Sequence, residues 1–198
     1  MRKALCVGID YYEFAEDLYG CVADAYSVKS ALDRNSDGTV NFSVNIMAAT
    51  GEDTGISRKE LKTSIEKLFA DESEVALFYY AGHGYIESTG GYLITSECKE
   101  GDDGFPLSEL LTIASSSKSM NKVIILDSCH SGAMGKINQF QEFSLISEGM
   151  TILTACSEKQ YASEENGHGV FTSLLVDALY GGAMNLVGEV TPGSVYAH

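Results

Sequence analysis

The chain has 198 residues, of which 44% are hydrophobic and 21% charged, a balance typical of one soluble globular domain. Its net charge of −15 argues against binding to nucleic acid or to an anionic membrane surface, because both attract basic patches. The same charge suits a cationic substrate or partner, although it also serves solubility alone. No apolar run of the sequence is as long as a membrane span.

Five widely spaced cysteines give no disulfide framework. Their number is odd and no CxxC pair occurs among them. Free thiols persist in a reducing compartment, so we expect a cytoplasmic protein. The cysteines are Cys6, Cys21, Cys98, Cys129 and Cys156.

Short apolar runs alternate along the chain with segments in which apolar residues recur at the spacing of a helix. The strand runs are continuous rather than alternating, which indicates strands covered on both faces of a parallel sheet. Strands that alternate with helices predict an α/β fold, a three-layer sandwich around a mostly parallel central sheet. In chain order we predict a strand over 4–9, a helix over 24–33, a strand over 42–48, a helix over 57–69, a strand over 74–80, a helix over 106–114, strands over 122–126 and 150–154, and a helix over 170–180.

The helix signals differ in strength. Ser57 and Glu60 form a capping box at the start of the second helix, whereas the first has only a possible cap at Asp24. Thr191 followed by a proline predicts one more helix near the end of the chain. We therefore expect residues 1–198 to form one domain, the N-terminal part of a longer protein.

In the polar segment 134–149, apolar residues recur at neither helix nor strand spacing, and the segment connects the last two predicted strands. We predict a mobile surface loop there.

Two predicted strands lead into chemically distinctive residues. Residues 78–84 read FYYAGHG, and residues 125–132 read ILDSCHSG. Carboxyl ends of neighbouring parallel strands meet at one edge of a sheet, so His83 and Cys129 could meet there. An imidazole activates a thiol as a nucleophile and later protonates the leaving amine. The backbone amides of Gly84 and Cys129 are candidates for an oxyanion hole.

These segments resemble the His and Cys motifs of the caspase-like cysteine peptidases, most of all the metacaspases and the bacterial caspase-like proteins. The segments KALCVGID, YGCVADA and TACSEKQYASE are similar too, so the resemblance covers nearly the whole chain. It implies a caspase-like fold and a cysteine endopeptidase with Cys129 as nucleophile and His83 as general base. It also implies a regulated protease of a defence or cell-death pathway, with regulatory domains or partner proteins beyond this domain.

The resemblance further implies a specificity. Metacaspase-like enzymes cleave protein substrates after Arg or Lys through acidic pocket residues, and the matching positions are Asp127 and Asp24. A carboxylate at a pocket floor pairs with a guanidinium or ammonium group. Cys21 is either a further pocket residue or a packing residue. Cleavage after Asp, the alternative, would need pocket arginines, and none stands beside either motif.

Two regulatory features of the family bear on this chain. Many metacaspases bind calcium through an acidic cluster about twenty residues before the Cys, but the matching segment 105–109 holds one acid, Glu109. Asp102 and Asp103 lie close by but out of register, so we expect no metal or other cofactor. Family members are often cut in the loop after the Cys strand, and Lys136 is the candidate for self-cleavage in this chain.

Other functions remain alternatives. A catalytically silent caspase-like scaffold would keep the fold without turnover. A zinc site built from His83, Cys129, His130 and Cys156 lacks chelate spacing. A nucleotide-binding domain would need a glycine-rich turn after the first strand, and residues 9–14 contain acids and no glycine.

Overall fold

The computed structural model describes residues 1–130, 148–155, 164–165, 168–185 and 188–198. Besides the main helices and strands, these residues form two short 3-10 helices, at Glu52–Thr54 and Gly101–Asp103, and a π-helical turn at Ala178–Gly182. The main elements in chain order are β1 (Arg2–Ile9), α1 (Cys21–Asp33), β2 (Phe42–Ala49), α2 (Arg58–Ala70), β3 (Val75–Glu87), β4 (Gly90–Leu93), β5 (Phe105–Pro106), α3 (Leu107–Ser116), β6 (Asn121–His130), β7 (Met150–Thr154), β8 (Glu164–Glu165), β9 (His168–Gly169), α4 (Val170–Asp177) and α5 (Pro192–Ala197).

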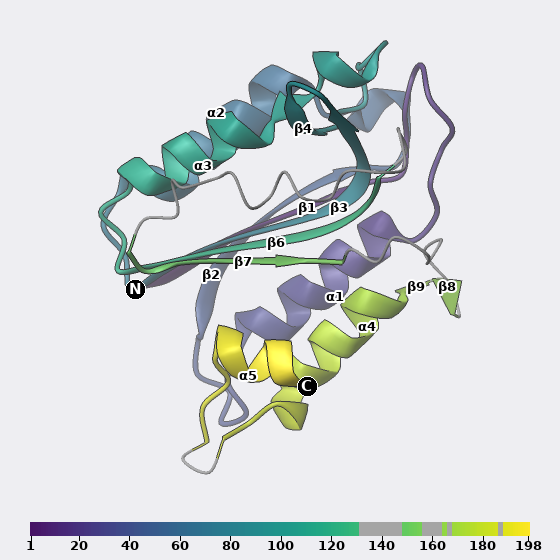
Figure 1. The fold of residues 1–198 in the computed structure, drawn as a ribbon. Helices are drawn as coiled ribbons and strands as arrows, with labels where there is room; N and C mark the ends of the chain where they lie inside the picture. Colours follow the sequence, from purple (N-terminus) through teal and green to yellow (C-terminus); the bar gives the residue numbers. More distant parts are fainter. Residues whose placement is uncertain (131–147, 156–163, 166–167, 186–187) are drawn as a thin grey trace.

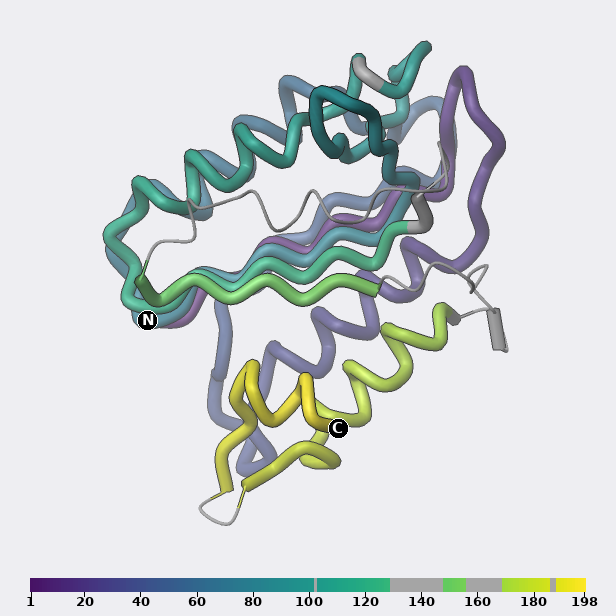
Figure 2. Tube along the Cα trace, viewed as in Figure 1, coloured from purple at the N-terminus to yellow at the C-terminus, as the bar shows by residue number. Residues whose placement is uncertain are grey.

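A seven-stranded, mostly parallel sheet forms the middle layer, which confirms the predicted fold class. β2, β1, β3, β6 and β7 lie side by side in this order and are all parallel (Figure 2). β4 adds antiparallel to the far end of β3, and β5 adds antiparallel to β4. Helices α2 and α3 cover one face of the sheet, and α1, α4 and α5 lie on the other (Figure 1). Within the described residues, no helix has the length and hydrophobicity to cross a membrane.

Two hydrophobic cores hold the layers together. One packs Leu61 and Ile65 of α2 and Leu110 of α3 against the sheet. The other packs Ala25 and Val28 of α1 against the opposite face, together with strand residues. The inner strands contribute side chains to both cores, which explains their continuous apolar runs.

Several element boundaries differ from the prediction. β3 continues through the glycine-rich segment to Glu87, because its end pairs with β4, and β6 likewise runs on to His130. His83 therefore lies inside a strand rather than after it. The short strands β4, β5, β8 and β9 have two to four residues each, too few to produce a readable pattern.

The predicted first helix begins too late. α1 starts at Cys21, and its N-cap is Gly20 in a left-handed conformation with no side-chain cap. Asp24 is thus a buried residue of the first turn rather than a cap. By contrast, the structure confirms the Ser57 and Glu60 capping box of α2 and the helix after Thr191. Of the predicted 134–149 loop, residues 134–147 lie outside the described residues.

Candidate active site

The register of β3 and β6 brings the two motif residues together. His83 is paired with Cys129, and the next residue, Gly84, with His130. Neighbouring strands lie about 5 Å apart, so the backbones of the predicted base and nucleophile are adjacent. Two motifs far apart in sequence thus lie side by side near the carboxyl ends of β3 and β6.

A main-chain carbonyl fixes the orientation of the His83 ring. Its Nε2 lies 2.8 Å from the carbonyl oxygen of Glu16, in the loop between β1 and α1. Because a carbonyl can only accept, Nε2 carries the proton, and the lone pair of a neutral imidazole is left on Nδ1. Nδ1 is buried and has no hydrogen-bond partner among the described residues. The ring thus holds an unused proton acceptor.

Tyr12 and Tyr80 hold the backbone around His83. The Tyr12 hydroxyl accepts a hydrogen bond from the His83 amide at 2.8 Å, and its ring lies 4.6 Å from the imidazole, centroid to centroid. The Tyr80 hydroxyl lies 2.9 Å from the His83 carbonyl and 2.7 Å from that of Ile94. Burial raises the pKa of both phenols, so both stay protonated near neutral pH.

The close packing of Tyr12 and Tyr80 requires a glycine at position 82. A Cβ at Gly82 would lie 2.7 Å from the hydroxyls of both Tyr12 and Tyr80. This distance is well inside van der Waals contact, so a larger residue would displace the tyrosines that hold His83. Close packing thus explains why this position of the motif is a glycine.

The loop that supplies the Glu16 carbonyl is tied down by its own acidic residues. Asp17 accepts from the Tyr12 amide at 2.9 Å, and Asp10 accepts from the Val22 amide at 3.2 Å. The Leu18 amide also donates to the Asp10 carbonyl at 2.8 Å. Sequence reasoning missed this loop, because the group that contacts His83 is a backbone atom that no residue type reveals.

The two predicted pocket carboxylates converge. Asp24 is 4% exposed in α1, and Asp127 is half-buried in β6, two residues before Cys129. The Gly169 amide donates to Asp24 Oδ2 at 3.0 Å, and a Cβ on Gly169 would lie 3.1 Å from Oδ2 of both aspartates. The structure therefore brings Asp24 close to Asp127, which lies two residues before the predicted nucleophile in β6.

Burial first, and then the nearby Asp24 carboxylate, raise the pKa of Asp127 above its ordinary value. A hydrogen bond from the Thr172 hydroxyl, at 2.6 Å, opposes this shift. Thr172 belongs to α4 and also contacts the Tyr79 hydroxyl at 2.6 Å. Neither residue was predicted, since a lone buried threonine or tyrosine carries no functional signal in sequence.

The remaining predicted site residues have varied settings. Cys21 is half-buried at the first position of α1, near the Asp24 turn. Gly84 is buried in β3 and is paired with Leu93 of β4 as well as with His130. Lys136 and Cys156 lie outside the described residues.

Glu109 is the one acidic residue of segment 105–109, which matches the calcium-binding segment of metacaspases. Its carboxylate lies near two basic side chains. Its carboxylate lies 2.5 Å from Lys62 Nζ and 3.8 Å from an Arg58 nitrogen. The described part of the chain contains no group of three or more His, Cys, Asp or Glu side chains placed to hold a metal ion.

Comparison with known proteins gives a family match and a fold match. Residues 1–190 match the family model described as the caspase domain. The structure is similar to the crystal structure of caspase-1 from Spodoptera frugiperda, with a TM-score of 0.67 and 13% identity over 93% of this chain and 71% of that one. It is also similar to the structure of pro-sf-caspase-1, with a TM-score of 0.57 and 13% identity over 93% of this chain and 72% of that one. No curated protein matched the sequence.

Proposed function

Because the chain belongs to the caspase-domain family of cysteine peptidases, we propose that it is an endopeptidase in which Cys129 is the nucleophile and His83 the general base. The observation that carries this proposal is the strand register that pairs His83 with Cys129. The imidazole beside this position has its proton on Nε2 and an unused acceptor at Nδ1.

In the proposed reaction, His83 Nδ1 takes the thiol proton, and the Cys129 sulfur attacks the substrate carbonyl carbon. The amides of Gly84 and Cys129 donate to the oxyanion that forms. Collapse of this intermediate breaks the peptide bond, and His83 gives its proton to the departing amine. Water then attacks the acyl-enzyme, with His83 again accepting a proton, and frees the thiol. The Glu16 carbonyl stabilises the imidazolium form of His83 during each transfer.

We propose that the enzyme cleaves protein substrates after Arg or Lys. Asp24 and Asp127 support this specificity, because their oxygens lie near each other, Asp24 is buried and Asp127 is half-buried. Two neighbouring carboxylates repel, so a substrate cation between them compensates both charges. Cys21, at the start of the same helix, is a further candidate for the pocket wall.

Self-cleavage after Lys136, a reducing cytoplasmic setting and a role in defence or cell death are further parts of this proposal. The family resemblance supports them, and Lys136 is a basic residue of the kind that the pocket would accept. Mass spectrometry of active enzyme would show a new C-terminus at Lys136, and an intact 131–147 segment in fully active enzyme would contradict self-cleavage.

The test of the main proposal is hydrolysis of fluorogenic peptides that end in Arg, Lys or Asp before the reporter group. We expect turnover after Arg or Lys, and a loss of at least 1,000-fold in Cys129→Ala, since removal of a catalytic nucleophile removes most of the rate enhancement. Cleavage after Asp would contradict the acidic pocket and retain the nucleophile. A chain that cleaves none of the peptides, with or without calcium, would favour the silent-scaffold alternative.

A further inference from the structure

The start of α4 holds both pocket carboxylates in place. Thr172, the third residue of this helix, is 1% exposed, and its hydroxyl lies 2.6 Å from Asp127 Oδ2 and 2.6 Å from the Tyr79 hydroxyl. A hydroxyl has one hydrogen to donate, and Thr172 gives it to the carboxylate. Tyr79 must then donate to Thr172, which fixes the direction of a buried chain of hydrogen bonds from Tyr79 through Thr172 to Asp127.

Gly169, the residue before the same helix, lies beside both carboxylates. Its amide donates to Asp24 Oδ2 at 3.0 Å, and a Cβ at this position would lie in tight contact, 3.1 Å, with Oδ2 of each aspartate. The two oxygens are therefore at most twice 3.1 Å apart. The backbone of Gly169 has φ −64° and ψ 134°, which any residue can adopt. The space beside the carboxylates, rather than backbone conformation, is thus what a side chain at this position would change.

We propose that Thr172 and Gly169 determine the specificity of the pocket: Thr172, held by Tyr79, orients the Asp127 carboxylate, and Gly169 orients Asp24 through its amide and, lacking a side chain, crowds neither carboxylate. The inference rests on the proposed function and deepens it, because it names residues outside both motifs that select an arginine or lysine side chain. Both act as positioning residues, through the aspartates.

The physical reason lies in the cost of a buried carboxylate. Asp127 can stay ionised beside Asp24 only if donors compensate its charge, and among the described residues the Thr172 hydroxyl donates to it. A valine at position 172 keeps the shape but removes the donor, and it leaves the Tyr79 hydroxyl without its acceptor. A methyl group at position 169 would occupy the point that faces both carboxylates.

The test uses two peptides that differ only in having arginine or its neutral isostere citrulline before the cleaved bond. We expect Thr172→Val to lower the arginine-to-citrulline ratio of kcat/KM at least tenfold, mainly by raising KM for arginine. Thr172→Ser restores the hydroxyl and should recover most of the ratio. Tyr79→Phe should lie between the two, and Gly169→Ala should reduce the ratio at least as much as Thr172→Val.

A role in positioning Asp127 also predicts a change in the pH profile. In wild type the Thr172 hydrogen bond favours the charged carboxylate and so lowers the pKa of Asp127. Its loss in Thr172→Val should raise this pKa, and the acid limb of kcat/KM for the arginine peptide should move to higher pH. The titratable groups around Asp127 and Tyr79 in the described residues are Asp24 and Cys21 of α1, and the Tyr79 phenol itself stays protonated. A merely structural loss would lower the whole profile without moving the limb.

The matched control is Thr112→Val, the same chemical change at an exposed position of α3. It should leave the arginine-to-citrulline ratio of kcat/KM unchanged. Alkylation of Cys129 by iodoacetamide reports the nucleophile independently of the pocket. Wild-type cleavage after arginine together with an unchanged ratio in Thr172→Val would overturn the inference and leave the proposed function intact.

If the wild type cleaves neither peptide, the proposed function fails, and binding of agmatine, a small guanidinium compound, still tests the pocket by calorimetry. Weaker agmatine binding to Thr172→Val than to wild type and Thr112→Val supports the inference. Equal binding to all three, or no binding at all, overturns it.

Discussion

At the scale of single residues, His83 depends on neighbours that perform no chemistry. Tyr12 accepts from its amide, Tyr80 contacts its carbonyl, and the Glu16 carbonyl holds its ring. Contacts to its amide, its carbonyl and its ring Nε2 leave His83 little freedom. This pre-organisation matters because proton transfer needs a base within hydrogen-bond reach of the thiol.

Tyr12→Phe tests this support. The substitution removes the acceptor of the His83 amide and leaves a partly buried donor unsatisfied, so we expect a loss of about 1–3 kcal/mol in the free energy of unfolding. We also expect kcat to fall roughly 3- to 30-fold, since a small displacement of a catalytic group costs about this much or more. Urea denaturation and peptide hydrolysis measure the two effects.

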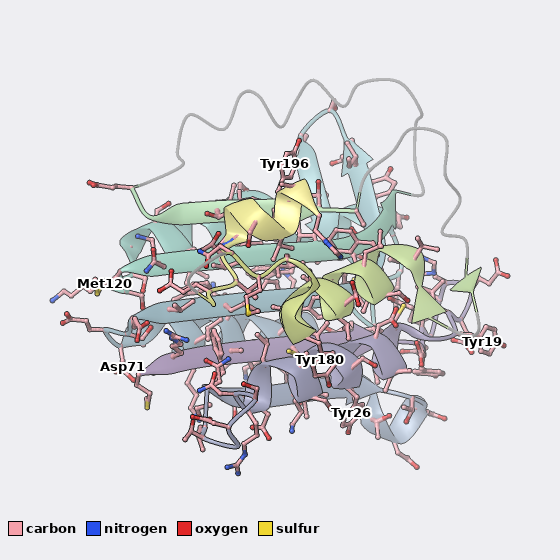
Figure 3. All side chains as sticks on the ribbon, turned by 90° about the horizontal axis from the view of Figure 1, so that it is seen from below. Tyr19, Tyr26, Asp71, Met120, Tyr180 and Tyr196 are labelled. Carbon is pink, nitrogen blue, oxygen red and sulfur yellow. The ribbon has the colours of Figure 1, made fainter. Side chains whose placement is uncertain are left out.

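The matched control for this change is Tyr196→Phe. Tyr196 is 84% exposed and belongs to α5, in the helical layer that faces the viewer in Figure 3. It should change neither stability nor activity. A Tyr12→Phe enzyme with unaltered kcat would show that the Glu16 carbonyl alone positions the ring.

Asp127→Asn tests the cost of the buried carboxylate. Asparagine can still accept from Thr172 but carries no charge beside Asp24, so we expect the unfolding free energy at neutral pH to rise by roughly 0.5–2 kcal/mol. Cleavage after Arg or Lys should be strongly reduced in the same protein. A loss of stability together with activity would contradict the view that the charge is kept for function.

The pH dependence of this gain has a definite sign. The folded protein raises the pKa of Asp127 above its unfolded value, so the charge destabilises the fold fully above the folded pKa and not at all below the unfolded one. The advantage of Asp127→Asn should therefore shrink as the pH falls from neutral through the raised pKa of Asp127. Denaturation of both proteins at a series of pH values measures this change.

The residues that could be predicted are those whose type is itself informative. His83 and Cys129 stand in glycine-flanked motifs, and Asp127 and Asp24 stand at matching family positions. The Glu16 carbonyl could not be predicted, because every residue has one. Thr172 and Gly169 could not be assigned to the pocket either, since only the folded chain places α4 against β6 and α1.

At the scale of elements, helix boundaries were predicted where side chains define them. Ser57 begins α2 through a reciprocal capping box with Glu60, in which the Glu60 amide donates to the Ser57 hydroxyl and the Glu60 carboxylate accepts from the Ser57 amide. α1 was misplaced because a backbone conformation, Gly20 at φ 104°, begins it instead. Strand ends were misplaced where pairing with another strand, invisible in sequence, extends them.

Ser57→Ala tests the capping box. We expect the unfolding free energy to fall by about 1 kcal/mol, the usual cost of losing an N-cap side chain. Ser64→Ala, the same change inside α2, should be neutral or slightly stabilising, because alanine favours helix. Denaturation in urea compares the two, and equal effects would show that the cap contributes nothing.

This penalty should depend on pH. The Ser57 hydrogen bonds lower the pKa of Glu60, so their contribution is present above the unfolded pKa of Glu60 and is lost as the pH falls through the lowered one. The difference between wild type and Ser57→Ala should therefore narrow in acid.

At the scale of the whole molecule, we expect the net charge of −15 to affect encounters with the proposed basic substrates. A negative molecule attracts a cationic peptide over a distance that salt shortens, to about 8 Å at physiological ionic strength. We expect kcat/KM for a peptide with two or more basic residues to fall several-fold between roughly 0.02 and 0.2 M salt. An uncharged analogue or a neutral thiol reagent should show little change, and a parallel decline for both would assign the effect to the catalytic groups.

The three-layer architecture was predictable because continuous apolar strands and intervening helices allow few arrangements. Strand order was not, since β3 lies next to β6, far from it in sequence, and that pairing creates the site. Local pattern thus yields the layers, and long-range pairing decides which residues meet.

The site draws on both sides of the segment 131–147. The strands that carry His83 and Cys129 precede this segment, whereas Gly169 and Thr172 follow it. A single cut after Lys136 would therefore turn the enzyme into a heterodimer, with reactive groups on one fragment and two pocket-orienting residues on the other. Selectivity for basic side chains would then depend on fragment association, and dilution would lower selectivity while the thiol and imidazole stayed on the same polypeptide.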